Sequence, residues 1–243
     1  MFVNKKFIFI SLPRCASTSF MITCLKNGIP IEHFNSKNDN QLDKINNWEK
    51  MDNELFADRI THSHEPLKML EEKFGNTHQV ISIKRDKYER FLSLWKHIID
   101  ELYRTGRIET AKIFSKLTIN DLFDEISPND VYNKESRDSL VENFLTKLKI
   151  SKENRYTKNI LNILFTPIVE LTNNDSKIIW FDINNLNELE KWVSKKLNMD
   201  FKMEKINSSK HFDCLIEINE DFKKKYDNIF IEFDERKSKK TLI

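Results

Sequence analysis

Two short apolar runs, each followed by a cation and by hydroxyl side chains, constrain this chain more than any other feature. Residues 6–20 pass from an apolar stretch to Arg14 and then to three hydroxyl side chains. Residues 80–95 repeat this order, with Arg85 after the apolar stretch and Ser93 further on. A strand, a turn and the start of a helix is the arrangement that binds phosphate-like groups. Its occurrence twice predicts a ligand with two separate anionic ends.

The rest of the hydrophobic pattern alternates short apolar runs with amphipathic segments. This alternation predicts an α/β fold with a parallel β-sheet and helices on both faces. We expect a single domain spanning residues 1–243, with a helical segment at about 100–170, because there is no repeat or low-complexity linker. The expected strands are residues 7–12, 80–84 and 177–181, and the expected helices are residues 17–27, 66–74, 87–103, 108–165, 186–197 and 221–236.

Composition excludes several classes of protein. The 243 residues include 40 Lys and Arg against 38 Asp and Glu, so the net charge of +2 gives no reason to expect nucleic acid or a membrane as a partner. Three cysteines without framework spacing argue against a disulfide-stapled secreted fold, and no zinc-binding pattern is present. The first apolar run is too short for a signal peptide or a membrane span. We therefore expect a soluble, cytoplasmic protein.

Together the two segments resemble those of sulfotransferases that use 3'-phosphoadenosine-5'-phosphosulfate (PAPS). Residues 13–19 are similar to that family's 5'-phosphosulfate loop, P-[KR]-x-G-[ST]-[ST], and residues 85–93 are similar to its 3'-phosphate motif, R-D-P-x-x-R-x-x-S. Ala16 replaces the usual Gly, and Lys87 replaces the usual Pro and adds a cation near the expected 3'-phosphate. The resemblance implies a P-loop-like sulfotransferase fold with a helical acceptor-side segment. It also implies PAPS as donor substrate, 3'-phosphoadenosine-5'-phosphate (PAP) as product, and a saccharide hydroxyl as acceptor, without a metal.

The resemblance also assigns the nucleotide contacts. A guanidinium can donate two parallel hydrogen bonds to two oxygens of one phosphate. Arg14 is therefore suited to bind PAPS and to stabilise the negative charge that develops during transfer. The late Asn-Ser-Ser-Lys stretch is similar to the family's loop over the nucleotide. The expected 5'-phosphosulfate contacts are Arg14, Cys15, Ala16, Ser17, Thr18 and Ser19, the expected 3'-phosphate contacts are Arg85 and Ser93, and the expected covering loop contains Ser208, Ser209 and Lys210.

The general base is predicted from His62-Ser63-His64. This pair resembles the His-x-His of the family branch that sulfates uronic-acid 2-hydroxyls of glycosaminoglycans. Histidine titrates near neutral pH and is the commonest general base. By the resemblance, either His62 or His64 deprotonates the acceptor hydroxyl and the other orients it, while Glu65 is the alternative base.

Two other functions stay open at this point. A P-loop kinase or another nucleotide phosphotransferase would require ATP and Mg²⁺, and the lack of a G-x-x-x-x-G-K-[ST] sequence and of an evident Walker-type carboxylate argues against it. A non-catalytic protein could retain the same fold and bind the nucleotide or a sulfated glycan without turnover. Ala16 and Lys87 leave room for this second alternative.

Overall fold

A computed structural model describes residues 1–32, 64–150, 155–173, 177–204 and 214–230. The chain divides into two compact units, which are described separately. The sheet unit consists of Met1–Asp86 and Leu171–Ser208, and the helical unit consists of Lys87–Glu170 and Ser209–Ile243. Whether the whole chain folds as one domain stays a prediction.

The sheet unit is built on five strands in the order β3-β1-β2-β4-β5. β2, β4 and β5 are parallel neighbours, as the alternating pattern predicts, whereas β1 runs antiparallel to both β2 and β3. The α/β class is therefore confirmed, but the prediction of a wholly parallel sheet is wrong because the sheet is mixed. The strands are β1 (Phe2–Val3), β2 (Phe7–Ile10), β3 (Ile31–Glu32), β4 (Gln79–Lys84) and β5 (Ile178–Asp182).

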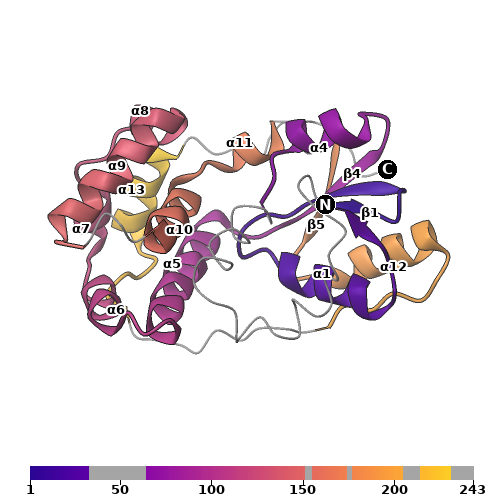
Figure 1. The fold of residues 1–243 in the computed structure, drawn as a ribbon, viewed down its shortest axis with the longest axis horizontal. Coiled ribbons are helices and arrows are strands. Elements are labelled where there is room, and N and C mark those ends of the chain that lie inside the picture. The colour runs from indigo at the N-terminus through magenta and orange to yellow at the C-terminus, as the bar shows by residue number, and fades with distance from the viewer. Residues whose placement is uncertain (33–63, 151–154, 174–176, 205–213, 231–243) are drawn as a thin grey trace. The chain divides into compact units, whose positions relative to one another are not determined.

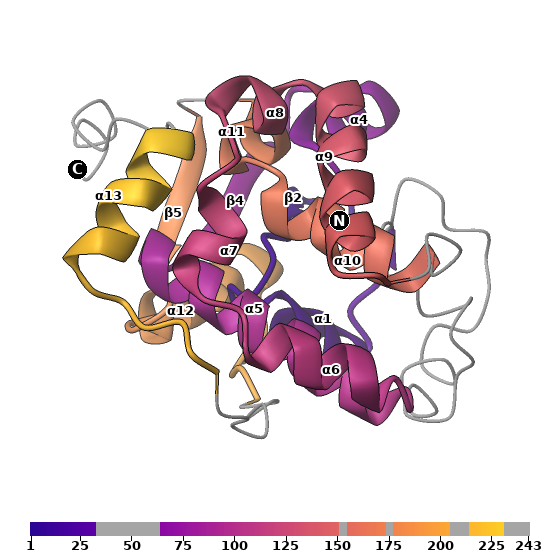
Figure 2. The ribbon, with the colours of Figure 1, turned by 90° about the vertical axis from the view of Figure 1, so that its left-hand side faces the viewer.

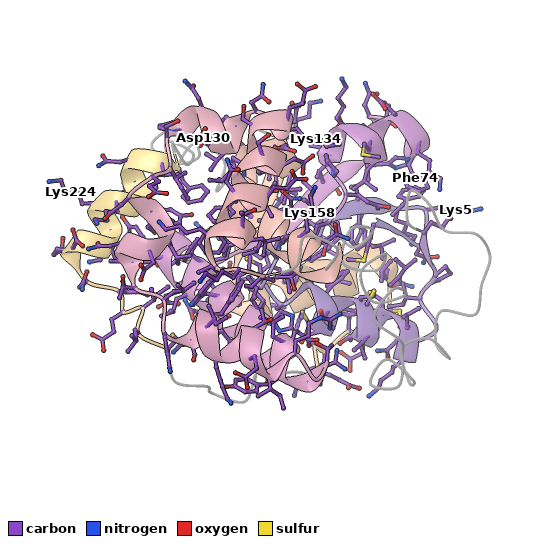
Figure 3. All side chains as sticks on the ribbon, turned by 60° about the vertical axis from the view of Figure 1, so that its left-hand side comes forward. Lys5, Phe74, Asp130, Lys134, Lys158 and Lys224 are labelled. Atoms are coloured by element: carbon purple, nitrogen blue, oxygen red, sulfur yellow. The ribbon has the colours of Figure 1, made fainter. Side chains whose placement is uncertain are left out.

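The antiparallel strand arises from a tight turn that sequence analysis missed. Asn4 and Lys5 both adopt positive φ, 46° and 52°, and Lys6 N–H donates to Val3 O at 2.9 Å. Positive φ at both central residues is the requirement of a type I′ hairpin, whose twist matches that of the strands it joins. Figure 3 labels Lys5, which points away from the sheet.

Helices cover both faces of this sheet (Figure 1). On one face, Phe9 of β2 stacks on Phe20 of α1 with ring centroids 4.0 Å apart, and Phe7 meets Trp192 of α12 at 5.1 Å. On the other face, Phe2 of β1 meets Phe74 of α4 at 4.6 Å. The helices of this unit are α1 (Ser17–Lys26), α4 (Leu67–Phe74) and α12 (Leu186–Leu197), close to their predicted bounds.

The helical unit contains the segment predicted to be helical, but as several short helices. Capping residues divide it: Thr118, Ser127 and Asn133 are each the N-cap of a new helix. α11 (Ile168–Thr172) extends across the boundary between the units, and residues 231–236 of the last predicted helix lie outside the described part. The remaining helices are α5 (Lys87–Arg104), α6 (Ile108–Ser115), α7 (Ile119–Phe123), α8 (Pro128–Tyr132), α9 (Lys134–Lys147), α10 (Arg155–Phe165) and α13 (Glu220–Ile229).

Aromatic rings fill the core of the helical unit. Phe91 of α5 packs against Phe123 of α7 at 5.3 Å and against Tyr226 of α13 at 5.6 Å. Trp95, fully buried, stacks on Phe114 of α6 at 5.1 Å. These contacts tie α6, α7 and α13 to the long helix α5 (Figure 2). In the described ranges, no helix combines the length and apolar character that a membrane crossing requires.

A capping box at the start of α7 makes a pH-dependent contribution to stability. Hydrogen bonds from the Thr118 backbone and side chain lower the pKa of Asp121 below its ordinary value of 3.8. We expect Asp121→Asn to lower the free energy of unfolding by about 0.5 kcal/mol at neutral pH, since the cap loses its charge-assisted bond. A carboxylate with a lowered folded pKa stabilises above its unfolded pKa, and this contribution is lost as pH falls through the folded pKa.

Urea unfolding of both proteins between pH 7 and pH 2 measures this difference. It should shrink toward zero at the acid end. A difference that stays constant with pH would show that the Asp121 charge does not stabilise the cap.

Candidate functional site

The two segments that the sequence singles out leave the sheet at the same edge. β2 and β4 are adjacent parallel strands, with Ile10 in register with Ser82. The buried Ser82 hydroxyl donates to Ile10 O across this pair at 2.9 Å. Parallel neighbours lie about 4.8 Å apart, and their carboxyl ends meet at one edge, where ligands bind in open α/β sheets. The loop at 11–16 and Arg85 therefore start from neighbouring points of that edge.

The loop after β2 has an unusual backbone. Arg14 and Ala16 both have positive φ, 61° and 56°, a region that non-glycine residues rarely adopt. Ala16 is the N-cap residue of α1 and makes no side-chain capping bond, while its carbonyl accepts from Phe20 N–H at 3.0 Å. Ala16 thus has a left-handed backbone at the position where the motif it resembles has Gly, a residue that adopts this conformation without strain. The N-terminus of α1 presents the positive end of the helix dipole at this loop.

The three expected hydroxyl donors differ in access. Ser17 and Ser19 are buried, and the Ser17 hydroxyl donates to Leu12 O within the loop at 3.4 Å. Thr18 is exposed and half-exposed Arg14 lies nearby in the sequence. Cys15 is 1% exposed and packs inside the loop. Thr18 is consequently the hydroxyl best able to reach a ligand.

His64 lies at the start of this loop, 53 residues away in the sequence. Its Nδ1 is 2.8 Å from Ser11 O and 3.4 Å from Ser11 Oγ. A carbonyl oxygen only accepts, so this contact requires a proton on Nδ1 and makes Nε2 the basic nitrogen of the neutral ring. Ser11 follows β2 directly and is buried. The structure therefore brings one of the two expected bases to the expected phosphosulfate loop.

The other expected bases and the expected covering-loop residues either lie outside the described part of the chain or are buried. His62, Ser208, Ser209 and Lys210 lie outside the described residues, and their roles stay predictions. Glu65, the alternative base, is 6% exposed, which leaves its carboxylate less access to an acceptor than His64 has.

The segment expected to bind the 3'-phosphate spans both units. Arg85 is half-exposed just beyond β4 and ends the sheet unit together with Asp86, whereas Ser93 is a half-exposed residue in the second turn of α5 in the helical unit. Their joint action on one phosphate stays a prediction.

Lys87 has a partner within the helical unit. Its Nζ lies 2.5 Å from Asp227 of α13, whose other oxygen accepts from Tyr88 OH at 2.8 Å. Burial alone would lower the pKa of Lys87, but the hydrogen bond and charge of Asp227 outweigh it and raise that pKa. The cation that stands where the resembled motif has Pro is thus paired with Asp227, so it contributes less unpaired positive charge than the sequence suggests.

Two polar residues at the edge were not identified as site residues from the sequence. Ser11 is one, because nothing in the sequence indicates its contact with His64. The other is Asp182, an exposed carboxylate at the end of β5 that pairs in register with Lys84. Its Oδ1 accepts from Asn184 N–H at 2.8 Å. The apolar run before Asp182 predicts a strand, so the sequence already indicated that this carboxylate follows the end of a strand.

One cluster among the described residues has metal-ligating side chains. His97, Asp100 and Glu101 of α5 have candidate ligand atoms within 4.8 Å of one another. Glu101, however, is buried and pairs with Arg104 through a contact of 2.5 Å. A guanidinium bound to a carboxylate competes with a cation for it, so this arrangement favours a salt bridge over a metal site.

Comparison with known proteins finds no relative. No family model matches the chain, and neither a curated protein nor a solved structure matches it significantly. The resemblance to sulfotransferases therefore depends on the sequence motifs alone.

The left-handed backbone at Ala16 predicts a stabilising substitution. We expect Ala16→Gly to raise the free energy of unfolding by about 0.5–1 kcal/mol, because relief of the left-handed strain exceeds the entropy that glycine adds to the unfolded chain. Urea unfolding of the full chain measures it. Ala111→Gly is the matched control, since Ala111 lies inside helix α6, and it should destabilise by about 1 kcal/mol or more. Destabilisation by both would contradict strain at Ala16.

Proposed function

We propose that this protein is a sulfotransferase on a P-loop-like fold, which transfers a sulfuryl group from PAPS to a saccharide hydroxyl. The observation that carries the proposal is the meeting of three expected elements at one edge of the sheet unit. These are the loop at 11–16, Arg85 just after the adjacent parallel strand β4, and His64 hydrogen-bonded to Ser11. A cation, a helix N-terminus and an imidazole with a fixed tautomer are what in-line transfer of a charged group needs.

Each group has a defined task in this proposal. PAPS supplies an activated sulfuryl group bonded to the oxygen of its 5'-phosphate. Arg14, the Thr18 hydroxyl and the first N–H groups of α1 bind the 5'-phosphate and stabilise the charge that grows on its bridging oxygen. His64 Nε2 accepts the proton of the acceptor hydroxyl as the new oxygen–sulfur bond forms. The old sulfur–oxygen bond breaks, its electron pair stays on the phosphate, and PAP leaves.

Ser11 acts on this reaction through His64. The hydrogen bond between Nδ1–H and Ser11 O holds the imidazole by its nonreacting nitrogen, so the ring does not need to select a tautomer during turnover. A base oriented in this way loses less entropy on reaching the transition state. The saccharide acceptor itself depends on the likeness of residues 62–64 to the His-x-His of glycosaminoglycan sulfotransferases.

A nucleotide phosphotransferase is the second candidate, and Asp182 favours it. A carboxylate at the carboxyl end of a sheet strand is a common ligand of the Mg²⁺ that accompanies ATP. Asp182 lies at this edge, one strand beyond β4. The two candidates differ in their nucleotide and in their need for Mg²⁺.

Calorimetric titration with PAP, AMP and ATP, with and without Mg²⁺, separates them. We expect PAP to bind without Mg²⁺ and at least about tenfold more tightly than AMP, since one charge-assisted phosphate contact is worth roughly 1.5–3 kcal/mol. Arg85→Ala should weaken PAP about 10- to 100-fold and leave AMP unchanged, because AMP lacks the 3'-phosphate. Lys5→Ala, an exposed cation at the opposite edge of the sheet, is the control. Preference for ATP with Mg²⁺ would establish the phosphotransferase instead.

The role of His64 predicts a loss of turnover without a loss of binding. We expect His64→Gln to lower the rate of PAP release from PAPS about 10²- to 10⁴-fold, the range for removal of a general base. The turnover assay uses the unsulfated polysaccharides heparosan and chondroitin as acceptors. The affinity of the variant for PAP should stay unchanged. His78→Gln, which removes a half-buried histidine that contacts Phe74 O, should leave the rate unchanged. An active His64→Gln enzyme would remove His64 from the mechanism.

A further inference from the structure

A groove of about 450 Å³ opens on the helical unit, within the range of ligand-binding cavities. It lies between the α7–α8 segment and one face of α9, so all of its walls belong to one unit. Four apolar side chains line its floor, of which two are buried and two are half-buried. These residues are Leu122, Ile126, Leu140 and Phe144.

The rim of this groove is acidic. Four carboxylates line it, from Asp121, Glu125, Asp130 and Glu135, against a single cation, Lys147. Lys147 is itself paired with Glu125 at 3.1 Å. The rim is therefore strongly negative, although the chain as a whole carries a net charge of +2. Such a surface favours an occupant that combines positive charges with apolar side chains.

Two of the rim carboxylates are fixed in position by helix caps. Asp121 accepts from Thr118 N–H at 2.8 Å, and Asp130 accepts from Ser127 N–H at 2.7 Å. Figure 3 labels Asp130 near the surface of α8. The hydrogen bonds that hold Asp121 also lower its pKa, so it stays charged well below neutral pH. A rim held in this way binds cations with little loss of side-chain entropy.

Helix α13 leads the chain to the groove. Its Lys225 contacts Asn120 of α7 and Asp124 just after α7, and Phe230, which follows α13, lies 6.3 Å from Phe123 between ring centroids. The neighbouring residues of α7, Asp121 and Leu122, face the groove. The described part of the chain thus ends beside α7, of which Asp121 and Leu122 line the groove.

Only the last part of the sequence that follows Phe230 has the composition that the groove favours. Residues 231–235 are acidic and apolar, and residues 236–243 read Arg-Lys-Ser-Lys-Lys-Thr-Leu-Ile. This basic tail, residues 236–243, carries four cations and then two apolar side chains. Six extended residues span roughly 20 Å, so the chain from Phe230 is long enough to deliver the tail to α7.

We propose that the groove between α7–α8 and α9 is the docking site of the chain's own basic tail, residues 236–243. The lysines and Arg236 pair with the rim carboxylates, and Leu242 and Ile243 cover the apolar floor. A short tether gives the tail an effective concentration on the order of millimolar, so even weak pairing fills the groove ahead of a separate basic peptide. The inference is independent of the proposed transfer activity.

Trypsin cleavage after Lys237, Lys239 and Lys240 of the full chain, followed by mass spectrometry, tests the docking. Cleavage of a docked tail depends on its undocked population. We expect cleavage to be about three to ten times slower at about 0.02 M salt than at about 0.5 M salt. A free peptide of residues 234–243, cleaved under the same conditions, corrects for the salt dependence of trypsin itself. Glu125→Lys with Glu135→Lys, which spares both capping boxes, should remove the protection. Adding Arg236→Glu and Lys239→Glu to that variant should restore protection at Lys237 and Lys240.

The matched control is Glu72→Lys with Glu109→Lys, which changes the net charge equally on exposed positions outside the groove. It should keep the protection of the original protein. Equal cleavage of the original protein and the Glu125→Lys, Glu135→Lys variant, each with an unchanged melting curve, would overturn the docking. Protection that grows with protein concentration would instead show exchange of the tail between copies, and would also overturn it.

Discussion

The parallel pairing of β2 with β4 is the constraint on which the candidate site depends. It sets the register of Ile10 and Ser82, and the buried Ser82 hydroxyl reinforces it with a bond to Ile10 O. Because both strands run in the same direction, the residues that follow each of them leave the sheet at a common edge. Any slip of this register would separate the loop that contains Arg14 from Arg85. The core contact of Phe9 with Phe20 then fixes α1, and hence its N-terminus, against the same strand.

His64 reaches this edge through a contact with Ser11, the residue that directly follows β2. The shorter of its two contacts with Ser11 is to the main-chain oxygen, at 2.8 Å against 3.4 Å for the hydroxyl, so the main chain is the main partner of the ring. A backbone partner also cannot take the proton away, which leaves Nε2 as the one nitrogen of the neutral ring that accepts. The sequence predicted a histidine base in residues 62–64 from a resemblance alone. The hydrogen bond to Ser11 adds an independent physical reason to prefer His64 within the described residues.

Much of the sheet unit could be predicted because its signals are local. The apolar runs of β2, β4 and β5 and the helices after them follow from hydrophobic periodicity. The β1–β2 hairpin escaped prediction because β1 has two residues and its turn uses Asn-Lys rather than a glycine pair. The contact of Ser11 with His64 spans 53 residues and leaves no pattern in either segment. The capping boxes that divide residues 108–165 were visible in the sequence, but the apolar spacing obscured them.

The loop at 11–16 shows how a backbone shape can persist without the residue that suits it best. Left-handed φ at a non-glycine residue costs about 1–2 kcal/mol, and both Arg14 and Ala16 adopt it. Such strain persists only where the surroundings over-determine the conformation. Here the buried side chains of Leu12, Cys15 and Ser17 provide that restraint, and two of the loop's carbonyls accept hydrogen bonds from within the loop and α1. Packing thus holds the left-handed backbone of this loop without a glycine, in a chain that has only three glycines.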